Sequence, residues 1–407
     1  MANIKILVWD LDIALKNSGG PSGYLYNWKT YLDNNSLSAT IVFLKDLLGK
    51  DNTYVNKHNK YEKLFGFAHK IGLTNFLNKI AVFRRCMSLK GEYEASDISN
   101  IDLNEYNFIH FHICYHILKA LPFLINYKGK IILTSHSPEP LSWEIANGIE
   151  GNHSIIKWYL RRSMGKLEIK SWQYADYLMF PVEGAMEPYF VSKSHKDFIE
   201  SNRHKLFFCP TSIIDRNISC IREKIENQYS IPKDAFIICY IGRHNEIKGY
   251  DQLVKLGERV LAENENVYFL IGGLNKPGQG VNHPRWIELG WINFGAELMA
   301  SSDLFILPNK ETYFDIVALE VLRTGTPMMM SLTGGNKYFK TIEPNDGLFF
   351  YKYGDLNAQE QIVCSLVNKS NQERTVLRSK NRQLFQKYFT MESFFERYIK
   401  TIESLKG

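Results

Sequence analysis

The stretch FIICYIGRHNEIKGY, residues 236–250, opens with a short apolar run and ends at the start of an amphipathic stretch. The run Phe236–Ile241 has the length and the Ile content of a strand. Gly242-Arg243 and Lys248-Gly249 lie between this run and the following helical pattern. Strand-to-helix units of this kind build parallel sheets covered by helices. The stretch therefore predicts an α/β fold.

The same alternation continues on both sides of this stretch. Five apolar runs follow it: Val267–Ile271, Trp286–Leu289, Leu304–Leu307, Met328–Met330 and Gly347–Phe350. Six runs precede it: Ile4–Trp9, Ala39–Phe43, Phe108–Phe111, Lys130–Thr134, Tyr177–Phe180 and Leu206–Phe208. Because Cys209–Lys233 contains prolines and a charged piece, we place a junction near residues 209–217. The pattern predicts two doubly wound, Rossmann-like domains, 1–212 and 213–390.

Length and composition are those of a globular protein. The chain has 407 residues, enough for two domains, at roughly 150 residues per domain. Its net charge of +6 is too small to argue for a nucleic-acid partner. The six cysteines form no C-x-x-C pair, which favours a reduced, cytoplasmic compartment. Asp10 and Asp12 interrupt the first apolar stretch, so we expect a strand there and no signal peptide or spanning helix.

One segment concentrates positive charge. Residues 55–90 contain eight basic residues and one acid, interleaved with aromatic side chains. Such a stretch can lie on an anionic bilayer, so we expect a surface for the inner leaflet of the cell membrane. The alternative is a solvated helical face over a core stripe.

Loops that follow the predicted strands are the places where open parallel sheets bind ligands. After the first strand comes the glycine-rich loop Gly19–Gly23, which either brings backbone amides close to a ligand or is a flexible turn. After Phe236–Ile241, Arg243 and Lys248 either converge on a diphosphate or are surface charges.

Two later loops complete this set. Pro308–Asp315 leads into an expected helix over Ile316–Arg323, with Asp315 as its N-cap. Glu320 lies on a different face from the apolar residues of that helix and either accepts hydrogen bonds from ligand hydroxyls or is an exposed helical Glu. Ser331–Asn336 contains Thr333-Gly334-Gly335, a further amide-rich loop suited to a sugar or phosphate.

Histidines gather at the ends of two strands in the first half. We place His110 and His112 on opposite faces of their strand, which argues against a shared zinc site. His136 follows the next strand and either contacts a ligand or is a hydrogen-bonded strand-end histidine. We expect no metal site.

Taken in order, these motifs resemble the GT-B fold retaining glycosyltransferases of family GT4. The resemblance covers nearly the whole chain and is strongest from Tyr240 to Gly335. The motifs are Gly19-Gly20, Phe108-Ile109-His110-Phe111-His112, Thr134-Ser135-His136, Ala175-Asp176, Gly242-Arg243, Lys248-Gly249, Gly290-Trp291-Ile292, Ser302-Asp303-Leu304-Phe305-Ile306-Leu307-Pro308, Ala318-Leu319-Glu320 and Gly325-Thr326-Pro327.

The resemblance implies specific roles in the second domain. Gly242, Arg243 and Lys248 would hold the diphosphate of a nucleotide-sugar donor, and the two cations would act in catalysis. Glu320 would bind the ribose hydroxyls. Trp291-Ile292 would lie near the base.

It also implies roles for the first domain and the end of the chain. Gly19 and Gly20 would bring amides near the phosphates and the sugar. His136 would act in catalysis beside the transferred sugar. Met391–Leu405, within the terminal segment 391–407, would be the last helix, which crosses back to the first domain.

One departure from the family pattern concerns the sugar-contacting acid. The family usually shows two glutamates with seven residues between them, and counting back from Glu320 reaches Thr312. Three alternatives are open: Thr312 contacts the sugar, Glu311 reaches it through a shifted loop, or Asp315 replaces it. The donor site is therefore expected over Glu311-Thr312-Tyr313-Phe314-Asp315.

The expected function is transfer of a hexose-type sugar from a UDP- or GDP-sugar to a glycan or lipid-linked acceptor. The resemblance implies retention at the sugar carbon, no metal and no cofactor. The composition suits bacterial surface polysaccharide or glycoconjugate synthesis. Two other functions are kept: a non-catalytic sugar-nucleotide-binding subunit, prompted by the missing glutamate, and a GT-B sugar-nucleotide epimerase.

Overall fold

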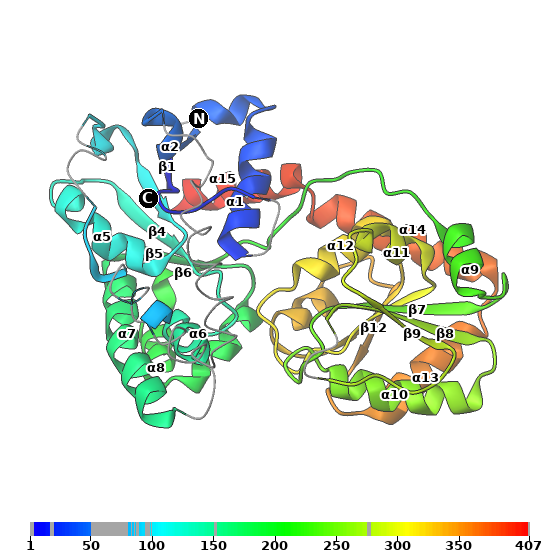
Figure 1. Cartoon of the computed structure of the whole chain (residues 1–407). Coiled ribbons are helices and arrows are strands. Elements are labelled where there is room, and N and C mark those ends of the chain that lie inside the picture. Colours follow the sequence, from blue (N-terminus) through cyan, green and yellow to red (C-terminus); the bar gives the residue numbers. More distant parts are fainter. Residues whose placement is uncertain are drawn as a thin grey trace. The chain divides into compact units, whose positions relative to one another are not determined.

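The computed structural model describes residues 4–16, 20–49, 80–82, 84, 86, 89–93, 98, 100–149, 153–274 and 278–405. The chain divides into two compact units (Figure 1). The first contains Met1–Phe180 and Pro188–Phe208, and the second contains Pro181–Glu187 and Cys209–Gly407. The chain therefore passes between the units three times, after Phe180, after Glu187 and after Phe208.

The first unit is built on a six-stranded parallel sheet with the strand order β2-β1-β3-β4-β5-β6. Its strands are β1 (Ile6–Trp9), β2 (Ile41–Phe43), β3 (Phe108–Phe111), β4 (Lys130–Thr134), β5 (Tyr177–Phe180) and β6 (Leu206–Phe208). Its α-helices are α1 (Gly20–Leu32), α2 (Leu44–Leu47), α5 (Cys114–Leu124), α6 (Leu141–Asn147), α7 (Ser154–Tyr174) and α8 (Lys193–Ser201). The connections β3 to β4, β4 to β5 and β5 to β6 all run in one direction along the sheet, whereas the connection β1 to β2 runs in the opposite direction. Because crossovers between parallel strands are right-handed, α5, α7 and α8 lie on one face of the sheet and α1 lies on the other.

The second unit repeats this plan with the strand order β12-β11-β10-β7-β8-β9. Its strands are β7 (Phe236–Ile241), β8 (Val267–Gly272), β9 (Trp286–Gly290), β10 (Leu304–Leu307), β11 (Met328–Ser331) and β12 (Leu348–Tyr351). Its α-helices are α9 (Arg222–Tyr229), α10 (Tyr250–Glu263), α11 (Gly295–Ser301), α12 (Ile316–Thr324), α13 (Leu356–Val367), α14 (Asn371–Tyr388) and α15 (Met391–Ser404).

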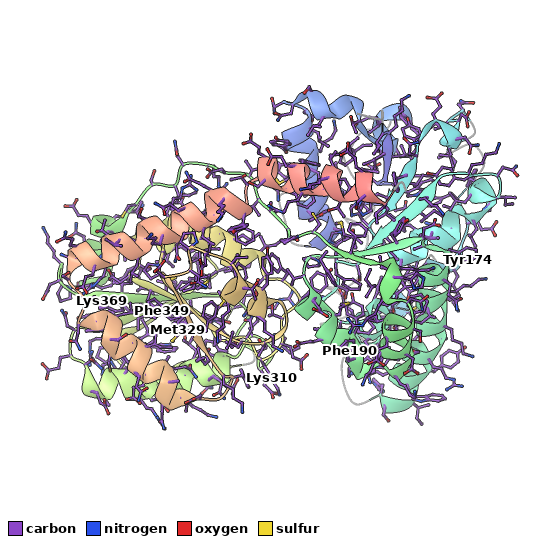
Figure 2. The ribbon with its side chains drawn as sticks, turned by 180° about the vertical axis from the view of Figure 1, so that it is seen from behind. Tyr174, Phe190, Lys310, Met329, Phe349 and Lys369 are labelled. Atoms are coloured by element: carbon purple, nitrogen blue, oxygen red, sulfur yellow. The ribbon has the colours of Figure 1, made fainter. Side chains whose placement is uncertain are left out.

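Alternate side chains of the second sheet enter two separate cores. Ile237 and Phe305 pack with residues of α11, α12 and α14 on one face. Ile238 and Ile306 pack with residues of α10 and α13 on the other. Met329, on β11, lies in this second core (Figure 2). Each fully buried aliphatic side chain contributes roughly 1.5–3 kcal/mol, so the two layers hold the sheet rigid beneath its loops.

The predicted fold class is confirmed. All twelve predicted strands are present, and each observed boundary lies within two residues of the prediction. In the first sheet the strand order reverses between β1 and β3, and in the second between β7 and β10. Ligands of open parallel sheets bind at such reversal points, beyond the carboxyl ends of the strands.

The predicted placement of His110 and His112 is wrong. Their rings stack, with centroids 4.2 Å apart and planes 27° from parallel. Side chains alternate along a strand with a period of two, so residues two apart lie on the same face. No metal-binding group of three or more His, Cys, Asp or Glu side chains was found, and no helix long and apolar enough to cross a bilayer, within the described ranges.

Candidate functional site

The reversal point of the second sheet brings together two loops that are far apart in sequence. Lys248, in the loop after β7, forms an ion pair with Asp315, in the loop after β10. Asn309 donates a 2.9 Å hydrogen bond from Nδ2 to the same carboxylate oxygen, Oδ2. The backbone N–H of Lys248 donates to Oδ1 of Asn245 at 2.9 Å. These bonds fix the lysine at the edge of the sheet.

Gly249 allows the two loops to approach closely. Its φ is +68°, and a Cβ built on it would lie 1.8 Å from the carbonyl oxygen of Pro308. Lys310 donates its backbone N–H to the carbonyl of Ile247 at 2.9 Å, which joins the loops a second time. Only glycine fits both the left-handed conformation and the short distance. The sequence Lys248-Gly249 is therefore a structural requirement of this loop pair.

Asp315 has two structural roles. Its Oδ1 accepts from the backbone N–H of Val317 at 3.4 Å, so it caps α12 as predicted. Burial alone would raise the pKa of its carboxyl, but Lys248 and the hydrogen bond from Asn309 hold that pKa below its ordinary value. Asp315 is thus an ionised counter-ion, and both of its oxygens are already in use.

Arg243 differs from Lys248 in its surroundings. Its side chain is exposed, and among the described residues its guanidinium forms no ion pair or hydrogen bond. Its backbone carbonyl accepts a 2.9 Å hydrogen bond from the hydroxyl of Tyr240, which holds the loop in place. An anchored backbone with an unpaired guanidinium suits a bidentate contact to a phosphate.

The remaining residues of the second loop occupy different environments. Glu311 is exposed, Thr312 is buried and Tyr313 is half-buried. Phe314 lies in the core, stacked on Phe339 with centroids 5.4 Å apart. Burial raises the pKa of the half-buried Glu320, an effect that Arg323 and Arg216 oppose. The side chain of Phe314 is therefore packing, whereas Glu311 and Glu320 have surface available for a ligand.

The amide-rich loop of Thr333-Gly334-Gly335 packs against the backbone of this same segment. A Cβ on Gly334 would lie 1.9 Å from the carbonyl oxygen of Thr312, and one on Gly335 would lie 2.0 Å from that of Tyr313. The N–H of Gly334 donates to Oε2 of Glu187 at 3.2 Å. The backbone N–H groups of Thr333 and Gly335 donate to the carbonyls of Ser331 and Thr312 at 3.0 and 3.3 Å. The loop thus leads into the 3₁₀ helix η6 (Gly334–Thr341) with all three of its amides already paired.

Trp291 and Ile292 follow β9. Trp291 is 79% exposed. Ile292 packs on the second core. Gly290, which precedes them, has φ +65° and open space around its Cβ position. Trp291 therefore presents its ring to solvent, where a planar base could stack on it.

In the first unit, Gly19 lies outside the described residues. Gly20, with φ +71°, begins α1, so Pro21-Ser22-Gly23 form the first turn of a helix and not the loop that was expected. The hydroxyl of Ser22 donates to the carbonyl of Ala14. This turn lies after β1, next to β3 in the sheet, at the reversal point.

His136 lies in an aromatic cluster at the same end of the first sheet. Its Nε2 is 2.9 Å from Nδ1 of His112, and the ring of Tyr24 is 4.6 Å away between centroids. Nε2 of His110 is 2.7 Å from Oγ1 of Thr134. Burial lowers the pKa of His136 to about 3 and holds the pKa values of His110 and His112 well below the ordinary range. All three imidazoles are therefore neutral near pH 7.

The hydrogen bond between two neutral rings defines their tautomers. Nε2 of His112 is buried and has no hydrogen-bond partner among the described residues. A buried N–H without an acceptor costs more than a buried lone pair without a donor. His112 therefore carries its proton on Nδ1 and donates to Nε2 of His136, which leaves the proton of His136 on Nδ1. In this form His136 can donate a hydrogen bond to a sugar hydroxyl.

Sequence reasoning missed the supporting residues Asn245 and Asn309. Both are ordinary loop asparagines in the sequence, and each acts on a residue of the site through one side-chain hydrogen bond. The position of Asn309 could have been recognised from the sequence, because it follows Pro308 directly after a predicted strand, where ligand-binding loops of parallel sheets begin.

Part of the second unit matches a known protein family. Residues 235–369 match the family described as Glycosyl transferases group 1. An uncharacterized glycosyltransferase of Methanocaldococcus jannaschii is 31% identical over 134 residues, or 30% of this chain and 34% of that protein. The match thus spans about a third of the length of this curated relative.

Solved structures cover nearly the whole chain. Sucrose-phosphate synthase from Thermosynechococcus elongatus superposes with a TM-score of 0.57 at 16% identity, covering 99% of each chain. Anabaena HepE in complex with UDP-glucose gives a TM-score of 0.57 at 15% identity, covering 98% of this chain and 100% of that one. The chain therefore has the GT-B fold of these structures, and residues 235–369 of it carry the family match. The matched residues include Arg243, Lys248, Asp315 and Glu320.

Proposed function

We propose that this chain is a retaining glycosyltransferase that moves a hexose-type sugar from a nucleotide-diphosphate sugar to a glycan or lipid-linked saccharide. The observation that carries the proposal is the cation pair at the reversal point of the second sheet. Lys248 is held by Asp315 and Asn245, and the exposed guanidinium of Arg243 is unpaired among the described residues. UDP-sugars are the first donors to test, because the HepE structure holds UDP-glucose. A GDP-sugar is the alternative.

In the proposed reaction, the bond between the sugar carbon and the diphosphate oxygen breaks. Negative charge grows on the diphosphate and positive charge on the sugar ring. Arg243 and Lys248 stabilise the departing diphosphate. Lys248 is held by Asp315 and the backbone of Arg243 by Tyr240, which lowers the cost of placing the two cations in the transition state. The acceptor hydroxyl attacks the same face that the diphosphate leaves, and its proton passes to a phosphate oxygen. This route needs no metal and no covalent enzyme intermediate, so we expect turnover in the presence of a chelator.

Other residues would position the donor. Glu320 accepts hydrogen bonds from the ribose hydroxyls, and Trp291-Ile292 lie near the base. For the first unit, the resemblance assigns His136 to a sugar hydroxyl and the amides near Gly19 and Gly20 to the phosphates. For the sugar-contacting group, Asp315 is disfavoured because both of its oxygens are occupied. Thr312 and Glu311 remain as candidates. The variants Thr312→Ala and Glu311→Gln distinguish them, because the variant with the larger increase in the KM for the donor identifies the residue that contacts the sugar.

The test is product formation by the full chain with UDP- and GDP-sugars and with glycan or lipid-linked acceptors. Arg243→Ala and Lys248→Ala are each expected to lower kcat/KM by about 100-fold or more. Lys255→Ala, which removes an exposed cation of α10, is the control and is expected to stay within about twofold. Turnover of the two site variants at the wild-type rate would contradict the proposal.

The same assay separates the two other functions. Donor binding without turnover on any acceptor would favour a non-catalytic binding subunit, for which Thr312 in the place of a glutamate is the supporting observation. Conversion of the donor sugar without an acceptor would favour an epimerase. Retention is measured by the configuration of the product linkage.

We further propose a cytoplasmic place of action, in bacterial surface polysaccharide or glycoconjugate synthesis. The basic segment 55–90 was expected to contact the inner leaflet. Residues 55–79 of it lie outside the described residues, so that expectation stays a prediction from the sequence.

A further inference from the structure

Helix α7 carries a row of cations on its outer face. Arg162, Lys166 and Lys170 follow one another at intervals of four residues and are all exposed. None of them forms an ion pair with a described residue. Like charges at this spacing repel one another, by roughly 0.2–0.5 kcal/mol per pair. The row is therefore unfavourable for the isolated protein and suits a surface that meets an anion.

The acid of this helix does not neutralise the row. Glu168 is the one acidic residue of α7, and it is buried. Its two oxygens accept from the backbone N–H groups of Leu141 and Ser142, at the start of α6, at 2.8 and 3.0 Å. Glu168 thus points inward, and the outer face keeps its full positive charge.

Apolar side chains extend the same face toward the start of the helix. Ile155 is 80% exposed, Tyr159 61% and Trp158 59%. Ile155 and Tyr159 lie in line with Arg162, Lys166 and Lys170. Successive members of this series of five are three or four residues apart, the spacing that places side chains on one face of a helix. Trp158 lies beside them, with the guanidinium of Arg162 5.7 Å from its ring centroid. Large exposed apolar residues next to cations are typical of helices that lie in the interface of an anionic bilayer.

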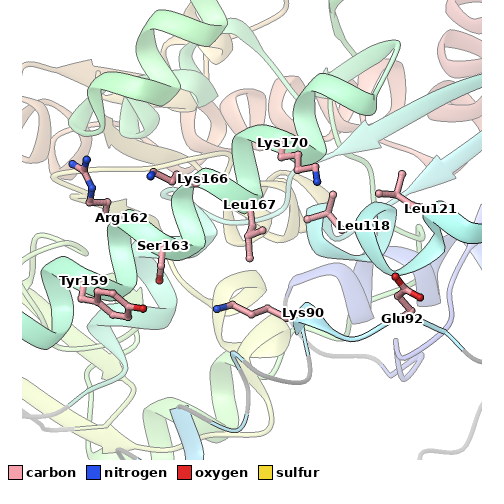
Figure 3. Close-up of a pocket in the computed structure, with 10 residues that line it drawn as sticks. All are labelled: Lys90, Glu92, Leu118, Leu121, Tyr159, Arg162, Ser163, Lys166, Leu167 and Lys170. Atoms are coloured by element: carbon pink, nitrogen blue, oxygen red, sulfur yellow. The ribbon is translucent and has the colours of Figure 1, made fainter.

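A pocket of about 660 Å³ opens on this face (Figure 3). Arg162, Lys166 and Lys170 line it from α7, and Lys90 reaches it from the opposite side. Glu92 is the one acid of its lining. Its apolar wall consists of Leu118 and Leu121 from α5 and Leu167 from α7. Cations around an apolar wall match a lipid headgroup phosphate and the first carbons of its chains.

We propose that the outer face of α7, with this pocket, docks the protein on an anionic phospholipid surface. The face is defined by Ile155, Trp158, Tyr159, Arg162, Lys166 and Lys170. Charge selects the partner: in a symmetric contact between two copies of the chain, the same cation rows would oppose each other. A bilayer that contains anionic lipid offers both negative charge and an apolar interior. The proposal goes beyond sugar transfer and does not depend on it.

The test measures binding of the full chain to phosphatidylcholine vesicles with and without phosphatidylglycerol, by flotation. Wild-type protein is expected to bind the anionic vesicles and to be released by high salt. The charge-reversal variant Arg162→Glu, Lys166→Glu, Lys170→Glu is expected to bind on the order of 100-fold more weakly, from about fivefold per lost cation. The matched control, Lys224→Glu, Lys233→Glu, Lys255→Glu, changes the net charge equally at exposed positions of the second unit.

A second variant tests insertion without changing charge. Ile155→Ser, Trp158→Ser, Tyr159→Ser replaces side chains that are already exposed, so it is expected to fold and yet to bind anionic vesicles at least tenfold more weakly. Brominated lipid should quench the tryptophan fluorescence of the variant Trp158→Phe less than that of the wild type, because the variant lacks the tryptophan of this face.

Three results would overturn the proposal. One is equal binding to vesicles with and without phosphatidylglycerol. Another is equal loss in the charge-reversal variant and its control. The third is a wild-type dimer that the charge-reversal or the serine variant converts to monomer, because the face would then be an interface between copies of this chain.

Discussion

The ion pair between Lys248 and Asp315 makes a quantitative prediction about stability. In Lys248→Met the carboxylate of Asp315 stays buried, with 9% of its side chain exposed, and loses its counter-ion. Removing one partner of a buried pair costs about 3–5 kcal/mol. Because Lys248 is 32% exposed, solvent screening lowers our expectation to about 2–3 kcal/mol. Asp315→Asn keeps an acceptor for the α12 cap and is expected to cost about 1–2 kcal/mol.

A double-mutant cycle measures the pair itself. The variant with both substitutions is expected to lose about 1–2 kcal/mol less than the sum of the single variants, by urea unfolding at about pH 8. Lys310→Met is the control from the loop of Asp315 (Figure 2 labels Lys310). Its partner Glu246 is exposed, so this substitution should leave the free energy of unfolding nearly unchanged.

The pH dependence gives a second check on the same pair. Lys248 holds the pKa of Asp315 below its ordinary value, whereas burial without Lys248 would raise it. The stability that the pair contributes is therefore present at neutral pH and is lost as the pH falls through the folded pKa. In Lys248→Met, burial raises the pKa of the Asp315 carboxyl, so it takes up a proton at a pH at which the wild-type carboxyl is still ionised. The variant thereby regains stability, and its difference from the wild type should shrink as the pH falls from about 8 to about 4. A coupling below about 0.3 kcal/mol, or a difference that does not change with pH, would refute this reasoning.

Three further predictions follow from single features. Gly249→Ala should lower the free energy of unfolding by about 3 kcal/mol or more, because its Cβ would meet a carbonyl oxygen. Gly290 has a similar φ and open space around its Cβ position, so Gly290→Ala should cost about 1 kcal/mol in the same unfolding assay. Burial raises the pKa of Asp10 to about 6, so Asp10→Asn should stabilise by about 1–3 kcal/mol at about pH 8 and lose this gain as the pH falls toward about 4. Nitrogen-15 spectra of labelled histidine should show the proton of His136 on Nδ1 in the wild type, and His112→Leu should let it redistribute; an Nε2 proton in the wild type would contradict the assigned tautomer.

Strand positions were predictable from the sequence because the strands are short apolar runs. The composition of such a run distinguishes it from the chain segments before and after it, so it can be recognised before its partner strands are known. The N-cap at Asp315 was predictable for a similar reason, since a cap depends on residues next to it in the chain. The candidate site residues were proposed from the loops and helix starts that follow strands, and their roles stay predictions.

Contacts between distant segments were not predictable. The sequence shows Lys248 and Asp315 separately, and their pairing depends on β7 and β10 being neighbours in the sheet. Local reasoning also failed for Pro21-Ser22-Gly23, where the glycine-rich composition suggested a loop and the chain forms the first turn of α1. The error for His110 and His112 was one of strand geometry, and their stacking follows from the two-residue period.

The short segment Pro181–Glu187 has a practical consequence for dissecting the chain. Glu187 accepts the N–H of Gly334 and pairs with Lys337 at 2.6 Å, yet it precedes the main junction by more than twenty residues. An excised fragment starting at Cys209 would leave both donors without this carboxylate and would remove the backbone that Gly184 packs against Gly334. A separately expressed second unit therefore needs residues 181–187 restored, for example by circular permutation or as an added peptide.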